Sequence, residues 1–89
     1  MNAVLHTLEQ RGSKRVSVAS LEEAARLIGT DAGDVTTLPY ANGEMAMSQR
    51  AQLDDTPVNR NASLVVQKLG GVKVGVRGTA IAFPKGLPW

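Results

Sequence analysis

The chain of 89 residues contains no cysteine, and this absence limits its possible folds more than any motif that is present. A domain of this size buries only about 60–65% of the surface of its unfolded chain, so its core is modest. Secreted domains of similar size usually add disulfides or a thiolate metal site. Neither can form here, so side-chain packing and backbone hydrogen bonds must hold the fold. The same absence predicts a reducing, cytoplasmic setting.

The core must be aliphatic. Hydrophobic residues make up 43% of the chain, as in ordinary globular proteins, but the aromatic residues are only Tyr40, Phe83 and Trp89. No apolar run approaches the about 20 residues of a membrane span, and the N-terminus does not resemble a signal peptide. We expect a single domain over residues 1–83 and a C-terminal tail over residues 84–89, in which the role of Trp89 stays open.

Apolar residues at helical spacing predict a first short helix over residues 2–11, with Gly12 at its end. Alternating valines then predict a short strand over residues 15–19.

A capping box begins the second predicted helix. The Ser20 hydroxyl can accept a hydrogen bond from the amide of Glu23, while the Glu23 carboxylate reaches back to the amide of Ser20. The helix then extends to Ile28, and Gly29 can adopt the left-handed conformation that ends many helices.

Residues 31–47 fit two structures. A short helix over residues 31–38 would have to stop ahead of Pro39. A hairpin would turn at Asn42-Gly43, the pair that best suits a two-residue turn, with Tyr40 opposite Met45. We prefer the hairpin, because its register places four apolar side chains on one face. These are Leu38, Tyr40, Met45 and Met47.

The remaining sequence predicts a long polar loop over residues 48–63, with one helical turn around Ala51, and then a three-stranded antiparallel meander over residues 64–83. Turns at Gly70-Gly71 and Gly78-Thr79 would separate the three strands. One face would be apolar except for Gln67. Its apolar side chains are Val65, Leu69, Val72, Val74, Val76, Ile81 and Phe83. The predicted fold class is therefore α+β, with two short helices and an antiparallel sheet.

Charge is distributed unevenly along the chain. Residues 1–55 hold five basic and eight acidic side chains, whereas residues 56–89 hold five basic side chains and no acidic one. Such asymmetry indicates a basic surface for an anionic partner, although lysine and arginine also occur simply as solvated residues of a sheet face.

A donor-rich cluster opens the basic part of the chain, just ahead of the first predicted strand of the meander. Amide and guanidinium groups suit a phosphate, a carboxylate or a base edge, although asparagines also stabilise ordinary turns. The candidate binding residues, including the basic residues further along, are Asn59, Arg60, Asn61, Ser63, Lys68, Lys73 and Arg77.

Catalytic and metal-binding patterns are not found in the sequence. A catalytic triad would have to use His6, the single histidine, on a short terminal helix. Metal sites need several suitable ligands together. The glycines of residues 70–75 precede no predicted helix, so they do not fit a phosphate-binding loop. We therefore expect a protein that is not an enzyme and needs no cofactor or metal.

Five short motifs stand in order between residues 20 and 83. They are Leu21-Glu22-Glu23 with Leu27-Ile28-Gly29, Val35-Thr36-Thr37-Leu38-Pro39, Gly43-Glu44-Met45-Ala46-Met47, Pro57-Val58-Asn59-Arg60-Asn61-Ala62-Ser63 and Gly78-Thr79-Ala80-Ile81-Ala82-Phe83. This pattern resembles a family of small domains of unknown function from bacteriophages and mobile elements. The resemblance implies a phage or plasmid accessory protein in the cytoplasm of a host cell.

Two binding functions follow as expectations. The first is an anti-defence protein that binds and inhibits a host factor, or that sequesters an anionic nucleotide signal. The second is a small nucleic-acid-binding regulator of winged-helix type, although residues 31–43 hold no basic side chain for a recognition helix. An exposed sheet edge would also permit a homodimer.

Overall fold

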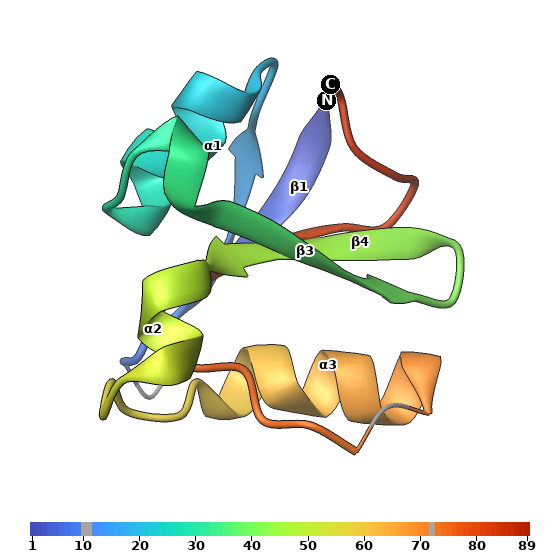
Figure 1. The fold of residues 1–89 in the computed structure, drawn as a ribbon. Helices are drawn as coiled ribbons and strands as arrows, with labels where there is room; N and C mark the ends of the chain where they lie inside the picture. Colours follow the sequence, from blue (N-terminus) through green and yellow to red (C-terminus); the bar gives the residue numbers. More distant parts are fainter. Residues whose placement is uncertain (10–11, 72) are drawn as a thin grey trace.

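The computed structural model describes residues 1–9, 12–71 and 73–89, and it shows an α+β fold, as predicted (Figure 1). A five-stranded antiparallel sheet has the order β2-β1-β5-β4-β3. The elements in chain order are β1 (Asn2–His6), β2 (Ser13–Ser17), α1 (Leu21–Ile28), the 3-10 turn η1 (Ala32–Asp34), β3 (Val35–Tyr40), β4 (Gly43–Ser48), α2 (Gln49–Leu53), α3 (Arg60–Gly70) and β5 (Ala80–Phe83).

Helices cover both faces of this sheet, with α1 on one side and α3 on the other (Figure 1). Strand β5 shows the arrangement most simply, because its four residues are all buried. Ala80 and Ala82 pack on the α3 side, while Ile81 and Phe83 pack on the α1 side. The aliphatic core is thus divided into two layers by one sheet.

The second predicted helix is confirmed as α1. The Ser20 hydroxyl accepts from the amide of Glu23 at 3.2 Å, and Gly29 has a φ of 92° at the helix end. The Glu23 carboxylate accepts from the amide of Ala19, at 3.4 Å, instead of from that of Ser20.

The hairpin is also confirmed, but its turn lies one residue earlier than predicted. Leu38 pairs with Met45 and Tyr40 pairs with Gly43, so the turn residues are Ala41 and Asn42, and Ala41 takes a φ of 48°. Gly43 lies in β4, where a Cβ would collide with the carbonyl oxygen of Phe83 and lie 2.9 Å from the Cα of Pro84. The close approach of two strands therefore uses the glycine that the sequence assigned to the turn.

This slip leaves the predicted face unchanged. Moving the turn by one residue changes every pairing by two positions, and strand side chains repeat every two residues. Tyr40, Met45 and Met47 are accordingly all buried on the α3 side, with Leu38 packed beside them.

The predicted helix over residues 2–11 is wrong, because Asn2–His6 forms strand β1. β1 lies between β2 and β5, and residues on both of its faces are packed: Ala3 and Leu5 lie on the α1 side, and Val4 packs against the α3 side. A strand buried on two sides has a continuous apolar run in place of alternation, and a short run of that kind also fits a helix. Residues 10 and 11 of the predicted helix lie outside the described residues. The following strand, β2, begins at Ser13, two residues before the prediction.

The predicted loop and meander are wrong over residues 60–70, which form helix α3. The helix begins after Asn59, whose side chain accepts from the amide of Ala62, and it ends at Gly71 with a φ of 66°. Within the described residues, the stretch around the predicted middle strand holds only an isolated bridge between Val58 and Arg77.

Three shorter predictions have mixed outcomes. Val72, assigned to the apolar face of the meander, lies outside the described residues. The last predicted strand is confirmed as β5, and the helical turn expected around Ala51 is α2.

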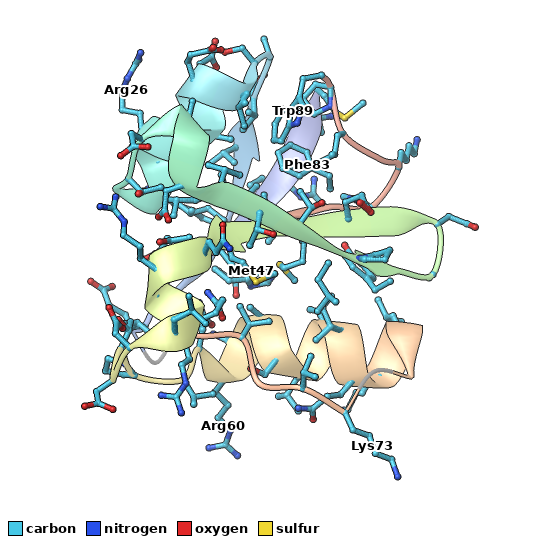
Figure 2. All side chains as sticks on the ribbon, viewed as in Figure 1. Arg26, Met47, Arg60, Lys73, Phe83 and Trp89 are labelled. Atoms are coloured by element: carbon cyan, nitrogen blue, oxygen red, sulfur yellow. The ribbon has the colours of Figure 1, made fainter. Side chains whose placement is uncertain are left out.

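The tail packs back onto the domain. The rings of Phe83 and Trp89 meet edge to face with centroids 5.4 Å apart (Figure 2). Leu87 is packed against the α1 side of the core. None of the helices in the described part of the chain has the length and apolar character to cross a membrane.

Candidate functional site

Asn59, the first predicted binding residue, is a structural residue. Its side chain is fully buried at the start of α3, and its Nδ2 donates to the carbonyls of His6 at 2.8 Å and Gly78 at 2.9 Å. Its Oδ1 accepts from the amide of Ala62 at 3.1 Å. These bonds join the beginning of α3 to β1 and to the turn before β5, and they leave no donor for a ligand.

Ser63 continues this structural role one helical turn later. Its hydroxyl accepts from the amide of Val76 at 2.8 Å, and Gln67, one further turn along, donates from its side chain to the carbonyl of Val74 at 3.1 Å. Asn59, Ser63 and Gln67 thus form a polar row at four-residue spacing, which faces the segment after α3. Gln67, which interrupts the apolar face of the predicted strand, therefore fits the four-residue spacing of a polar helix face.

Arg77 is also engaged inside the molecule. Its Nη1 donates to the carbonyl of Thr56 at 2.7 Å, while its backbone exchanges hydrogen bonds of 2.8 Å with the side-chain amide of Gln52. The guanidinium fixes the segment between α2 and α3, so we remove Arg77 from the candidate site.

The remaining predicted cations gather on one side of the molecule, together with exposed apolar residues. We call this region the α3 surface, and its residues are Arg60, Leu64 and Lys68 on the helix and Lys73 and Val74 after it. Leu64 is 40% exposed and Val74 is 44% exposed. Figure 2 shows Arg60 and Lys73 directed away from the sheet, near opposite ends of the helix.

The three helical residues of the α3 surface form a row that is inclined to the helix axis. Arg60, Leu64 and Lys68 are spaced four residues apart, so they lie on one helix face with the leucine between the cations. Eight residues of helix span about 12 Å. The sequence did not reveal Leu64 or Val74, because both were assigned to strands of a sheet. Predicting a helix over residues 60–70 would have placed these three side chains on one face.

The cations of the α3 surface have no acidic partner among the described residues. The ion pairs of the described residues lie away from this surface and join Arg50 to Asp31 at 3.2 Å and to Asp34 at 3.4 Å. Apolar exposure is concentrated in the same part of the chain, because five of the nine exposed large hydrophobic side chains among the described residues lie between residues 53 and 74. Positive charge and apolar surface therefore occur together.

Asn61, the last predicted binding residue, lies at the edge of a hollow of about 410 Å³. Thr7, Leu8, Glu9, Val58 and Arg60 line the rest of it. Of the predicted residues, the structure thus brings Arg60, Lys68 and Lys73 to one exposed surface, with Asn61 beside Arg60.

A second hollow of about 410 Å³ lies between α1, α2 and the turn before β5, next to a hydrogen-bonded cluster around Asp34. The Asp34 carboxylate accepts from the hydroxyl of Ser48, from the hydroxyl of Thr30 at 2.7 Å and from the amide of Arg50 at 3.0 Å. Each charged or hydroxyl side chain in this cluster is hydrogen-bonded within it, so the cluster fixes η1 against β4 and α2. We assign it a structural role.

The Asp34 cluster should make the stability of the fold depend on pH in acid. Hydrogen bonds from Ser48 and Thr30, followed by the amide and charge of Arg50, lower the pKa of Asp34 from 3.8 to about 2. A carboxyl group whose pKa is depressed by folding stabilises the native state above its unfolded pKa, and this contribution is lost as the pH falls through the folded value. We expect Asp34→Asn to reduce the loss of unfolding free energy between pH 4 and pH 2 in urea titrations.

The matched control for that titration is Asp55→Asn, which removes one exposed carboxylate outside the cluster. Equal acid profiles for the two variants would contradict the assigned role of Asp34.

His6 is buried in β1, and burial lowers its pKa. Its Nδ1 lies 2.7 Å from the hydroxyl of Ser13 on the neighbouring strand. Within the described ranges, no three histidine, aspartate or glutamate side chains are grouped as ligands of a metal ion.

Comparisons with known proteins do not identify the chain. No family model matches it, and no match is found among curated proteins or solved structures. The resemblance to a phage domain family stays a prediction, and the function must be inferred from the surface itself.

Proposed function

We propose that this protein acts without catalysis, by docking its α3 surface against an acidic surface of another protein. The observation that carries this proposal is the row of Arg60, Leu64 and Lys68, in which two cations without acidic partners in the described chain flank an exposed leucine. Interfaces of this composition combine an apolar centre with charges that select and steer the partner.

The spacing of the charges favours a macromolecule over a small anion. Arg60 and Lys68 stand about 12 Å apart along the helix with Leu64 between them, so they do not form a compact pocket for one phosphate group. Neither of the two hollows of about 410 Å³ contains Lys68 or Lys73 among its lining residues. A single nucleotide would engage one cation at a time, whereas an acidic protein surface could engage all of them together with Leu64.

The resemblance to phage domains suggests the kind of partner. Under the proposal, the protein belongs to the accessory proteins of a phage or mobile element, and its partner is an acidic host protein, such as a defence factor, that it inhibits by occupying a functional surface.

A capture experiment tests this function. Immobilised wild-type protein is exposed to bacterial lysate, and each captured protein is purified and titrated directly. We expect Arg60→Glu combined with Lys68→Glu to weaken binding at least about tenfold, because both cations become repulsive. Added salt should also weaken binding of the wild type.

The matched control combines Arg26→Glu with Lys85→Glu, which changes the net charge equally at exposed sites away from α3. This control should bind within about twofold of the wild type. Equal binding by the α3 double variant, or the absence of any direct partner, would contradict the proposal.

Nucleic-acid binding is the second candidate, favoured by the lack of acidic residues after position 55. The structure places the β3–β4 hairpin at residues 35–48, so a recognition helix would have to be α3. If Arg60, Lys68 and Lys73 each contacted a phosphate, the logarithm of affinity for duplex DNA would fall with the logarithm of salt concentration at a slope of about −3. If the wild type showed such a slope and the α3 double variant did not, DNA would be the partner in place of a protein. A nucleotide adduct in native mass spectrometry would instead indicate a sequestered signal.

A further inference from the structure

The outer edge of strand β2 is free, and its orientation follows from the ladder with β1. Met1 and Val18 exchange backbone hydrogen bonds of 2.9 and 3.1 Å, and the amide of Thr7 donates to the carbonyl of Gly12 at 2.8 Å. Hydrogen-bonded pairs alternate in an antiparallel ladder. The intervening bonded pairs are therefore Ala3 with Val16 and Leu5 with Lys14.

The other residues of β2 must direct their backbone groups away from the sheet. Ser13, Arg15 and Ser17 thus offer three N–H groups and three carbonyls along one edge. No backbone hydrogen bond to these groups is found among the described residues. All three side chains are exposed, and β2 is the end strand of the sheet.

The opposite edge is less suited to pairing. Strand β3 contains Pro39, which has no N–H group to donate. β2 contains no proline, and it is therefore the edge on which an additional strand could form an unbroken ladder.

We propose that β2 binds an extended acidic segment of a partner protein, which adds to the sheet as a sixth strand. Backbone groups of Ser13, Arg15 and Ser17 would supply the ladder. Arg15 shares a sheet face with Val4, its neighbour on β1, whereas Val16 lies on the α1 side. The segment that fits best therefore carries an acidic residue opposite Arg15 and an apolar residue opposite Val16.

Charge also argues against a second copy of the chain as the occupant. Lysine and other charged residues on an edge strand commonly prevent identical edges from pairing. Two β2 edges would bring Lys14 and Arg15 of each copy together with no acidic residue on either strand. An acidic strand would convert the same cations into attractive contacts. This inference concerns a different surface from α3 and stands without the proposed function.

The test uses a synthetic peptide of about seven residues in which glutamate alternates with valine, because this is the length of a typical strand. The peptide is titrated into the isotopically labelled full chain and followed by amide resonances. We expect the amides of Ser13, Arg15 and Ser17 to shift together and to exchange more slowly with solvent. A peptide with lysine in place of glutamate should not produce these changes.

Two variants separate the backbone from the charge. Ser17→Pro removes an outward N–H group while leaving the bonds to β1, and it should abolish the shifts, whereas Ser17→Ala should retain them. Arg15→Glu should weaken binding about fivefold through the lost cross-strand pair. Shifts confined to residues outside β2, no shifts at millimolar peptide, or binding that survives both Ser17→Pro and Arg15→Glu would overturn the proposal. A dimer that Ser17→Pro converts to monomer would also overturn it, by showing a second copy on this edge.

Discussion

Replacing Asn59 by alanine is expected to lower the free energy of unfolding by about 3 to 5 kcal/mol. The substitution removes the cap of α3, worth about 1 kcal/mol. It also leaves the buried carbonyl of Gly78 without its donor, which costs about 1 to 3 kcal/mol, and it removes one of two hydrogen bonds to the carbonyl of His6, which pairs with Ala80 in the sheet, at about 0.5 to 1.5 kcal/mol. Domains of this size are stable by only about 5 to 10 kcal/mol, so the variant should unfold at a much lower urea concentration.

Asn61→Ala provides the matched control for this measurement. Asn61 is the same residue type two positions later, but it is half-buried and caps no helix. Its replacement should change the free energy of unfolding by less than about 0.5 kcal/mol. If the Asn59 variant lost less than about 1 kcal/mol, the assigned hydrogen bonds could not be the principal contribution of this side chain.

Gly43→Ala is expected to destabilise the fold by about 2 to 3 kcal/mol, the upper part of the usual cost of overpacking. The added Cβ meets the backbone of Phe83 and Pro84, which cannot rotate away as a side chain could. Strand β4 would have to move away from the end of β5, at the centre of the sheet. Thermal and urea unfolding would both report the change.

Gly33→Ala serves as the comparison, since its added Cβ meets only the carboxylate of Asp31 at 3.5 Å, an ordinary contact. Replacing a glycine without strain usually stabilises a protein by about 0.4 to 1 kcal/mol. Similar effects of the two substitutions would mean that Gly43 serves the turn and not the approach of the strands.

Local signals in the sequence predicted local structure well. The Ser20 capping box depends only on neighbouring residues, and α1 forms where it predicts. The apolar face of the hairpin also emerged correctly, because strand periodicity survives a slip of two positions. The exact position of the turn was not predicted correctly. Gly43 is required by the close approach of the backbone of Phe83 and Pro84, which lie far away in sequence.

Errors arose where the environment of a segment decides its structure. β1 is paired with β2 and β5 and packs against both layers of the core, and its continuous apolar residues carry no periodicity that excludes a helix. Residues 64–69 show the reverse problem. Their alternation imitates a strand, while the decisive signals are the cap at Asn59 and the spacing of Ser63 and Gln67.

The candidate site was predicted in part for the same reason. Charge asymmetry along the chain correctly pointed to Arg60, Lys68 and Lys73 as exposed cations, because long charged side chains rarely lie buried without partners. It could not show that Asn59 points inward and holds the structure together. That distinction depends on which carbonyls the folded chain brings near it.

The position of β5 has a consequence for how the protein is made. This strand lies in the middle of the sheet, between β1 and β4, although it follows every other strand in the sequence. While residues 80–83 are still inside the ribosome, the two strands that will flank β5 have no neighbour at that position. Completion of the sheet must therefore wait until these residues have emerged. A nascent chain interrupted before this point would expose two inner strands with unpaired edges to chaperones and proteases.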